Sequence, residues 1–167
     1  MRLPQPFGKY LLLERISVGG MAEVFKAKAF GVEGFEKIIA IKKILPTMVE
    51  DDEFITMFLD EARISVQLNH PNVVQIHELG KQDEQFYIAM DYVAGKDLKT
   101  ILERYRRRRE IMPTAQAVHL AIQMSRGLDY AHKKKDARGL DLHIVHRDVS
   151  PQNILVGYDG TVKIIDF

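Results

Sequence analysis

The sequence predicts an α+β fold of two lobes, a strand-rich first lobe over residues 1–93 and a helical second lobe over residues 94–167. Short β-prone runs separated by turn residues fill most of the first ninety residues, whereas apolar residues at helical spacing dominate the second half. The change in character falls at Tyr92–Lys96, which indicates a short linker. Two lobes joined by a linker predict a cleft between them, and such clefts commonly bind ligands.

The first lobe contains five predicted strands, each bounded by turn-forming residues. They cover Tyr10–Ile16, Glu23–Lys28, Lys37–Leu45, Val73–Leu79 and Gln85–Tyr92. Gly19-Gly20 predicts a hairpin turn between the first two strands, and the polar run Lys81–Glu84 predicts a turn between the last two. These strands predict one five-stranded sheet.

One helix is predicted among these strands. Thr47-Met48-Val49-Glu50 has the form of a capping box that opens a helix, and His70-Pro71-Asn72 ends it. Apolar residues recur between these signals at helical spacing, namely Phe54, Met57, Phe58, Ala62 and Leu68. This stripe predicts an amphipathic helix.

The second lobe is predicted to hold a short helix near Asp97–Arg107 and a longer helix over Thr114–Lys134. The predicted apolar face of the longer helix comprises Ala117, Val118, Ala121, Ile122, Met124, Leu128 and Ala131. Two short strands, Ile154–Gly157 and Val162–Ile165, follow around the turn Tyr158-Asp159-Gly160.

Composition limits the classes of partner. The chain has 167 residues, of which 46% are hydrophobic and 28% charged, and its formal net charge is +1, so a nucleic-acid partner is not expected. It has no cysteine, which excludes disulfides and thiolate metal sites. No apolar run approaches the roughly 18 residues of a membrane span. The N-terminus lacks the apolar stretch of a signal peptide, so we expect a cytoplasmic location.

The strongest local signal is His146-Arg147-Asp148-Val149-Ser150-Pro151-Gln152-Asn153. Asp148 and Asn153 lie five residues apart, with a proline between them. At that spacing a carboxylate can serve a hydroxyl while an amide binds a cation on phosphate, as phosphoryl transfer requires. The alternative interpretation is a polar turn with an Asx bend, in which four fixed residues coincide by chance.

Two charged residues of the first lobe are predicted to pair. Lys42 ends the apolar run Ile38–Ile41, where an unpaired ammonium is costly, and Glu61 lies on the apolar stripe of its own helix. Each residue supplies the charge that the other lacks. The alternative is a lysine that extends to solvent and a glutamate at the rim of the stripe.

These segments resemble the signatures of eukaryotic-like (Hanks-type) serine/threonine protein kinases, in the family's order and over essentially the whole chain. The matching residues are Val24, Ala40-Ile41-Lys42, Glu61, Met90-Asp91-Tyr92-Val93, the loop at 146–153 and Asp166-Phe167. The stretch Val18–Val24 is most similar to bacterial members. The resemblance implies a protein-kinase-like bilobal fold, ATP and Mg²⁺ as cofactors, and protein substrates with serine or threonine acceptors.

The resemblance also implies the catalytic roles. Asp148 is implied to accept the proton of the substrate hydroxyl. Lys42, held by Glu61, is implied to position the α- and β-phosphates. Asn153 and Asp166 are implied to bind magnesium.

The nucleotide-binding residues that the resemblance implies come from both lobes. They are Ser17, Val18, Gly19, Gly20, Val24, Ala40, Lys42, Met90, Asp91, Val93, Asp97 and Leu155. The glycine-rich loop keeps only its middle glycine, Gly19, with Gly20 beside it, and an ordinary hairpin turn is the alternative. Val24, Ala40 and Leu155 are implied to cover adenine, and core packing is the alternative for them. Asp97 is implied to bind the ribose, and a helix N-cap is the alternative for it.

Departures from the family pattern leave the activity of this chain open. Serine/threonine kinases usually carry lysine two residues after the loop aspartate, and tyrosine kinases arginine four residues after it, where this chain has Ser150 and Gln152. Losing such a donor lowers rates about 10²–10³-fold. The family also continues well beyond Phe167, so we expect a fragment. The alternative functions are a nucleotide-binding pseudokinase or scaffold module, and a small-molecule phosphotransferase of the aminoglycoside type.

Three further features favour structural interpretations. Arg104–Arg109 is interpreted as a solvated helix end, with a docking or acidic-substrate surface as the alternative. Lys133-Lys134-Lys135 is interpreted as a helix C-terminus favoured by the helix dipole. His146 is expected to pack in the core beneath Phe167.

Overall fold

The computed structural model describes residues 3–48 and 51–167, which form two compact units. The first unit comprises the chain up to Val66 together with Ile76–Tyr92, and the second comprises Gln67–Gln75 and Val93–Phe167. Each unit has a hydrophobic core of its own. Gln67–Gln75 therefore belongs with the second unit, although the sequence pattern places it in the first lobe.

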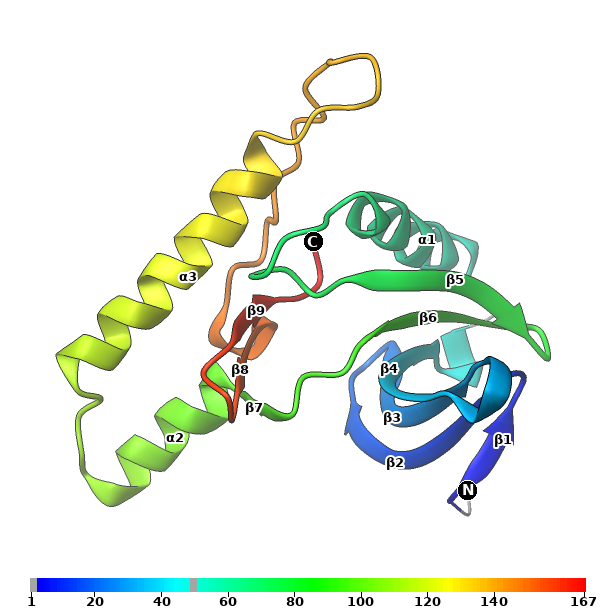
Figure 1. The fold of residues 1–167 in the computed structure, drawn as a ribbon, viewed down its shortest axis with the longest axis horizontal. Helices are drawn as coiled ribbons and strands as arrows, with labels where there is room; N and C mark the ends of the chain where they lie inside the picture. Colours follow the sequence, from blue (N-terminus) through cyan, green and yellow to red (C-terminus); the bar gives the residue numbers. More distant parts are fainter. Residues whose placement is uncertain (1–2, 49–50) are drawn as a thin grey trace. The chain divides into compact units, whose positions relative to one another are not determined.

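Six antiparallel strands form the sheet of the first unit, one more than the sequence predicts (Figure 1). In spatial order they are β1 (Gln5–Phe7), β2 (Tyr10–Val18), β3 (Ala22–Phe30), β4 (Glu36–Ile44), β6 (Gln85–Asp91) and β5 (Ile76–Gln82). The additional strand is β1, which contains Pro6. Proline has no N–H to donate, and strands tolerate it at a sheet edge, which is where β1 lies.

The predicted turns of this sheet are present. Between β2 and β3, the N–H of Gly19 donates to the carbonyl of Ala22 at 2.8 Å. Between β5 and β6, Asp83 and Glu84 both have positive φ, 48° and 62°, as a two-residue type I′ turn requires. The β3–β4 connection contains a short 3₁₀ turn, η1 (Val32–Gly34), that the sequence pattern does not predict.

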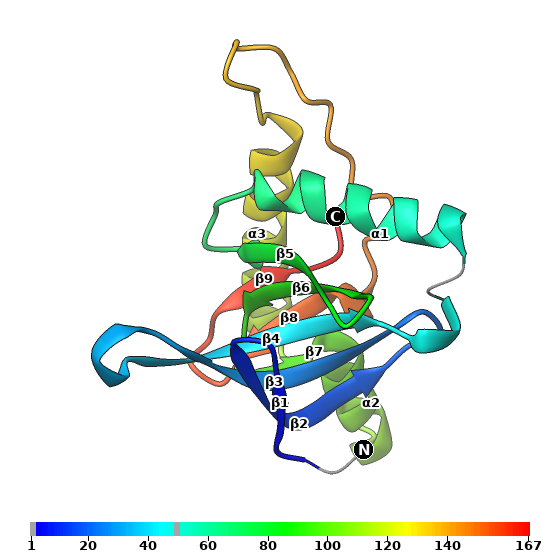
Figure 2. The ribbon, with the colours of Figure 1, turned by 90° about the vertical axis from the view of Figure 1, so that its right-hand side faces the viewer.

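Alternation along the strands gives the sheet two apolar faces. One face packs into a cluster of Phe7, Tyr10, Leu12, Phe25, Ala27, Ile39, Ile41, Tyr87 and Ala89. The other face packs against helix α1 (Asp52–Val66) in a cluster of Ile44, Phe54, Phe58, Ala62, Ile76 and Ile88. Figure 2 shows α1 running along β5. This apolar cluster fixes the helix over the second face of the sheet.

The start of α1 differs from the prediction. Asp51 precedes the helix, and its carboxylate accepts the N–H of Phe54 at 3.0 Å, which satisfies one of the free donors of the first turn. Thr47, the predicted capping residue, lies instead in the 3₁₀ turn η2 (Pro46–Met48). The second half of the predicted capping box, residues 49–50, lies outside the described residues.

The predicted apolar stripe of α1 is wrong at two positions. Met57 is 57% exposed, and Leu68 lies beyond the end of the helix, fully buried in the core of the second unit. The buried positions within α1 are Phe54, Phe58, Ala62 and Ser65. Successive members of that set are three or four residues apart, so they share one side of the helix.

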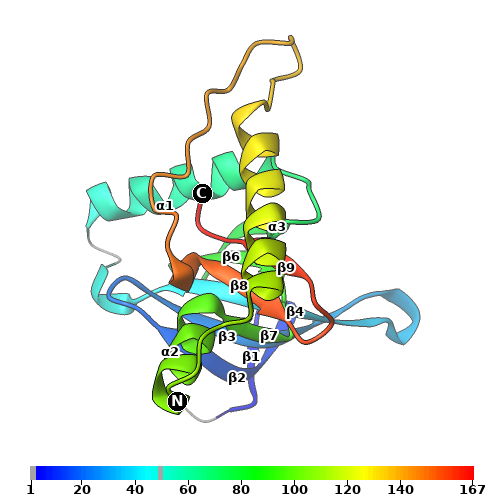
Figure 3. The same cartoon turned by 90° about the vertical axis from the view of Figure 1, so that its left-hand side faces the viewer.

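A three-stranded sheet lies at the centre of the second unit (Figure 3). Its strands, in spatial order, are β7 (Gly95–Asp97), β8 (Ile154–Gly157) and β9 (Val162–Ile164). The sequence predicts only the hairpin of β8 and β9. A Cβ at Gly95 would lie 1.9 Å from the carbonyl oxygen of Val156, so glycine is required where β7 pairs with β8.

Two helices complete the second unit, α2 (Leu98–Arg108) and α3 (Thr114–His132). α3 packs on β9 with its buried residues Leu120, Gly127 and Ala131. Met124, Leu128 and Ala131 of the predicted apolar face pack in the core of the unit. The other members of that face, Ala117, Val118, Ala121 and Ile122, are exposed, so the prediction is wrong at these four positions. None of the helices in the described parts of the chain has the length and apolar character of a membrane span.

Asn72 attaches the segment Gln67–Gln75 to the second unit. Its Nδ2 donates to Gln123 of α3 and to the carbonyl of Val162, both at 2.9 Å, and its own carbonyl accepts the N–H of Ile164. These bonds hold the segment beside β9. The predicted strand Val73–Leu79 consequently begins only at Ile76.

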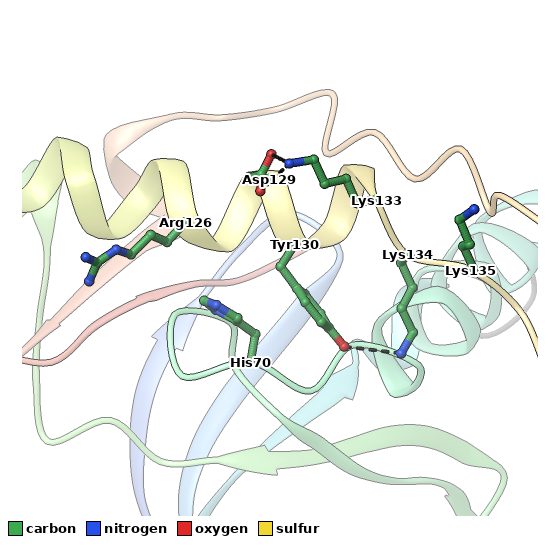
Figure 4. Close-up of a pocket in the computed structure, with 7 residues that line it drawn as sticks. All are labelled: His70, Arg126, Asp129, Tyr130, Lys133, Lys134 and Lys135. Atoms are coloured by element: carbon green, nitrogen blue, oxygen red, sulfur yellow. Dashed lines mark hydrogen bonds and ion pairs between the residues drawn. The ribbon is translucent and has the colours of Figure 1, made fainter. Parts of the chain in front are cut away.

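Tyr130 of α3 also contacts this segment (Figure 4). The ring of His70 stacks on it with centroids 5.0 Å apart, and its hydroxyl accepts the N–H of Asn69 at 3.0 Å. Lys134 Nζ lies 3.2 Å from the same hydroxyl. In the run Lys133-Lys134-Lys135, Lys134 is therefore the member that contacts Tyr130.

Candidate active site

Lys42 and Glu61 form an ion pair within the first unit. Lys42 Nζ lies 2.7 Å from Glu61 Oε1. Lys42 is on β4, and Glu61 is on α1 beside the buried Ala62. The two side chains are only 14% and 26% exposed, so each charge is partly removed from water and needs its partner. This geometry contradicts the alternative of a lysine that extends to solvent.

Val24, Ala40 and Met90, three of the residues implied to line the nucleotide site, share one face of the sheet with Lys42. The register places Val24 opposite Lys42 and Ala40 opposite Met90. Ala40 and Lys42 are two residues apart on β4, so their side chains point to the same side. The strands therefore bring the four side chains into one patch of the first unit.

The side chain of Asp91 has a structural role. Its Oδ1 lies 2.9 Å from His77 Nε2 and 3.7 Å from Lys37 Nζ. The resemblance assigns the nucleotide contact to the backbone of Asp91 and of Val93, and that assignment stays a prediction.

The glycine-rich loop folds as a tight hairpin turn. Ser17 pairs with Val24 and Val18 with Glu23 across β2 and β3. Neither glycine of the turn has a positive φ. A Cβ at Gly19 would meet only Ala22 O at 3.5 Å, and a Cβ at Gly20 would have no neighbour within 4 Å. The turn itself therefore does not explain why two glycines stand here.

Asp148 and Asn153 are held together in the second unit. Asn153 Nδ2 donates both to the backbone carbonyl of Asp148 and to its Oδ2, each at 3.0 Å. Asn153 is buried at the end of the 3₁₀ turn η3 (Pro151–Asn153), whereas Asp148 is exposed. Because both bonds use the amide nitrogen, Oδ1 is the atom that Asn153 can offer to a cation.

Asp166 lies next to this loop because the residue before it is hydrogen-bonded to the backbone of the loop. The N–H of Ile165 donates to the carbonyl of Asn153 at 3.0 Å. Asp166 has a φ of 61° and Arg147 a φ of 66°, both in the left-handed region that few residues other than glycine adopt. Strained backbone of this kind tends to gather at functional sites.

The predicted packing of His146 is confirmed. The side chain is 4% exposed, and its ring lies 4.6 Å from that of Phe167, centroid to centroid. Its Nε2 lies 2.8 Å from the carbonyl oxygen of Ile165. His146 thus links the loop to the chain around Asp166.

Ser150 carries a feature that the sequence does not signal. Within the described part of the chain, its Oγ is the one fully buried side-chain polar atom without a hydrogen-bond partner. Buried hydroxyls normally find a partner, so this atom calls for an explanation. From sequence alone Ser150 is only a departure from the family pattern, because a serine hydroxyl can be satisfied in most surroundings.

The remaining predicted residues lie in the second unit. Asp97 caps α2, with its Oδ1 accepting the N–H of Thr100 at 2.8 Å, so the N-cap interpretation is correct. Leu155 of β8 is the register partner of Asp97.

The predicted residues thus fall into two groups. Lys42 and Glu61 belong to the first unit, whereas Asp148, Asn153 and Asp166 belong to the second. Their convergence around one triphosphate is a relation between the units and stays a prediction.

Residues 10–167 match the protein kinase domain family, and the chain belongs to this family. It is 44% identical over 165 residues to the protein named tyrosine-protein kinase MasK of Myxococcus xanthus, covering 99% of this chain and 26% of that protein. It is 34% identical over 160 residues to the serine/threonine-protein kinase PrkC of Bacillus subtilis, covering 96% of this chain and 22% of that protein.

The fold is likewise that of protein kinases, as the sequence predicts. A crystal structure of the Mycobacterium tuberculosis PknI kinase domain matches 100% of this chain with a TM-score of 0.76 and 29% identity, over 61% of that domain. Another crystal structure of the same domain matches with a TM-score of 0.73 and 31% identity, over 62% of its length. The chain spans about a quarter or less of the curated relatives and about three fifths of these kinase domains.

Proposed function

We propose that this chain is the nucleotide-binding and catalytic-loop part of a cytoplasmic protein kinase that transfers the γ-phosphoryl group of ATP to serine or threonine hydroxyls of proteins. The observation that carries the proposal is the loop in which Asn153 holds Asp148 by two hydrogen bonds of 3.0 Å. A polar turn has no need to fix an exposed carboxylate by a buried amide. A proton acceptor for a substrate hydroxyl does need a fixed position.

Asp148 is the proposed proton acceptor, and its exposure leaves the carboxylate open to a protein substrate. Asn153 and Asp166 would hold Mg²⁺, because amide and carboxylate oxygens are the ligands that this hard cation prefers. When bound, Mg²⁺ would neutralise part of the charge on the phosphates. The backbone bond from Ile165 to Asn153 keeps these two residues near one another.

Lys42 is proposed to bind the α- and β-phosphates, with its ammonium oriented by Glu61. Small residues at Gly19 and Gly20 would let backbone N–H groups approach phosphate oxygens, which supplies the reason that the turn itself lacks.

The adenine would lie against the apolar side chains of Val24, Ala40 and Leu155, with Met90 at the back of the site. The backbone of Asp91 and Val93 would bind the adenine edge, and Asp97 would reach the ribose. These contacts would bring the nucleotide against residues of both units.

A pseudokinase scaffold is the alternative from another class of function. It has support from Ser150, which replaces the lysine usual in serine/threonine kinases, and from the loss of two glycines of the glycine-rich loop. Against it stand the paired Lys42 and Glu61 and the bonded Asp148 and Asn153, since a scaffold has no use for either arrangement.

Tyrosine is the second candidate acceptor, favoured by the 44% identity to a protein named as a tyrosine kinase. Serine and threonine are favoured by the names of the relatives at 33–36% identity and by Pro151-Gln152 in the loop. Position 152 holds glutamine and not the arginine usual in tyrosine kinases, which also argues against a tyrosine acceptor.

Phosphoamino-acid analysis tests both proposals. The protein, expressed from its complete reading frame, is incubated with Mg²⁺ and γ-labelled ATP, alone and with casein, and the labelled residues are separated after acid hydrolysis. We expect phosphoserine and phosphothreonine, and label confined to phosphotyrosine would overturn the acceptor assignment.

Asp148→Asn is the matched control, because its side chain can still accept a bond from Asn153. Label should fall at least about 100-fold, as expected for loss of a general base. Thermal stabilisation by Mg-ATP should persist. Binding without any label in the unmodified protein would support the scaffold instead.

A further inference from the structure

A pocket of about 440 Å³ lies in the second unit between α2 and strand β8. We call it the basic pocket. Its floor includes Ile101 and Val156, which are half-buried and pack against the core of the unit. Its rim includes the exposed cations Lys96, Arg104 and Arg108. Figure 3 shows α2 beside the β7–β8–β9 sheet that supplies the other wall.

The helix presents two kinds of side chain to the basic pocket. Ile101 and Tyr105 are four residues apart and form an apolar row, while Arg104 and Arg108 form a charged row beside it. On the opposite wall, Tyr158 is 79% exposed, which is high for an aromatic side chain. The pocket thus combines an apolar floor with a cationic edge.

The charge of the basic pocket is not balanced locally. Three cations face one carboxylate, Glu110, whereas the whole chain has a formal net charge of only +1. Among the residues that the structure describes, none of these three cations takes part in an ion pair. On the same helix, Arg107 pairs with Glu103 at 3.9 Å.

The helix dipole explains only part of this arrangement. Cations in the last turn of a helix are favourable, which accounts for Arg106, Arg107 and Arg108. Lys96 precedes the N-cap and so lies at the positive end of the dipole, where a cation is unfavourable. Arg104 lies inside the helix, and its neighbour Arg108, four residues on, repels it. Lys96 and Arg104 therefore do not stabilise α2.

A second hollow of the unit, shown in Figure 4, also has more cations than carboxylates in its lining, namely Arg126, Lys133, Lys134 and Lys135 against Asp129. Lys133 pairs there with Asp129 at 2.7 Å, and Lys135 pairs with Asp141 at 3.6 Å. Two of its three lysines are thus paired with carboxylates, and Lys134 is hydrogen-bonded to Tyr130. The difference from the basic pocket is that the three rim cations there have no ion pair among the described residues.

We propose that the basic pocket docks an acidic peptide segment of a partner protein. An apolar side chain of the peptide would occupy the floor at Ile101 and Val156, and its carboxylates would meet Lys96, Arg104 and Arg108. Arginine suits carboxylates because its planar fork can bind both oxygens. A nucleic-acid partner is disfavoured, because the chain as a whole lacks the excess of basic residues that such binding needs.

Fluorescence anisotropy tests this docking in the protein expressed from its complete reading frame, without ATP, so that the result does not depend on phosphotransfer. The probe is a fluorescein-labelled peptide of glutamates around one leucine. The comparison probes replace its glutamates by glutamine or its leucine by glycine. We expect the acidic leucine peptide to bind, and both replacements to weaken binding about tenfold or more.

The double variant Arg104→Ala/Arg108→Ala should weaken binding of the acidic peptide about tenfold or more, because it removes two of the three rim cations. Arg106→Ala/Arg107→Ala is the matched control, since it removes the same charge from the same helix outside the basic pocket. The affinity of this control variant for the acidic peptide should stay within about twofold of that of the unmodified protein. All four arginines are exposed, so thermal melting should be alike in the two variants.

Equal weakening by the two double variants would overturn the proposal, because it would reduce the effect to general surface charge. Equal binding of the glutamine peptide would also overturn it. So would displacement of the peptide by a single-stranded oligonucleotide that binds more tightly than the peptide does.

Discussion

Each unit contains one half of the proposed site, and the two halves are built in different ways. In the first unit, Lys42 on a strand and Glu61 on a helix are nineteen residues apart in sequence and meet at 2.7 Å because α1 packs on the sheet. In the second unit, Asp148 and Asn153 are five residues apart and are bonded through backbone and side chain. One half depends on the placement of a helix, the other on the conformation of a loop.

This difference determines what disturbs each half. Any shift of α1 against the sheet separates Glu61 from Lys42 without altering either residue. The loop around Asp148 is bonded to its own backbone and, through His146 and Ile165, to the chain before Asp166. It keeps its geometry as long as the core of the second unit is folded.

The largest expected effect comes from the first half. Lys42→Met should lower kcat/KM for phosphotransfer about 10²–10³-fold, because it removes a preorganised donor to the phosphates. Glu61→Gln should have a smaller effect, because Glu61 acts through Lys42. The double variant should be little worse than Lys42→Met alone, which a double-mutant cycle on the full-length protein measures. Fully additive losses would mean that the two residues act independently.

The second half should be sensitive to a change at Gly127, where α3 meets the segment of Asn72. A Cβ at this position would lie 2.9 Å from Asn72 O and 3.0 Å from Ile164 Cδ1. Gly127→Ala should lower the free energy of unfolding by about 1–3 kcal/mol, measured by urea denaturation, although alanine favours helices more than glycine does.

Ser125→Ala on the same helix is the control for Gly127→Ala. Ser125 is exposed, so the change should alter the free energy of unfolding by no more than about 0.5 kcal/mol. An unchanged stability in Gly127→Ala would show that α3 and the Asn72 segment can move apart without cost.

Features encoded by neighbouring residues were predictable from the sequence. The hairpin turn at Gly19-Gly20, the cap by Asp97 and the loop from His146 to Asn153 all follow from residue types at short spacing. The Lys42–Glu61 pair was also predictable, because a charge within each apolar pattern required a partner. Burial leaves few ways to satisfy such a charge.

Features that depend on tertiary contacts were not predictable. β1 and β7 have three residues each, too few for alternation to show, and they exist because neighbouring strands offer them partners. The segment Gln67–Gln75 follows a helix of the first unit, yet its asparagine bonds to the second. The positive φ of Asp166 is only weakly signalled by its residue type, since aspartate adopts the left-handed region more often than most residues but still rarely.

A smaller effect is expected on the face of the first unit away from α1. Glu78 accepts hydrogen bonds from the hydroxyls of Tyr10 at 2.7 Å and Tyr87 at 3.0 Å. Burial raises the pKa of Glu78, but the bonds from Lys9 and the two tyrosines outweigh burial and hold this pKa below its ordinary value. Burial together with Glu78 raises the pKa of Tyr87 to about 12.

The pH dependence follows from the lowered pKa. The contribution of Glu78 is fully present above its unfolded value of about 4.5 and is lost as the pH falls through the lower folded pKa. Glu78→Gln should therefore cost about 1 kcal/mol of unfolding free energy at neutral pH, and the difference from the unmodified protein should close in acid. Glu84→Gln, in an exposed pair, should change stability by less than about 0.5 kcal/mol at any pH.

The smallest effect separates two roles of one residue in the second half. Asp97 caps α2, and it is also the proposed contact to the ribose. Asp97→Ala should lower the free energy of unfolding by about 1 kcal/mol, whereas Asp97→Ser keeps a capping oxygen and should be nearly neutral. If Asp97 binds the ribose, both variants should raise KM for ATP by a similar factor of about 3–10, the loss of one hydrogen bond. A normal KM in Asp97→Ser, with a raised KM only in the destabilised Asp97→Ala, would leave the residue with its structural role alone.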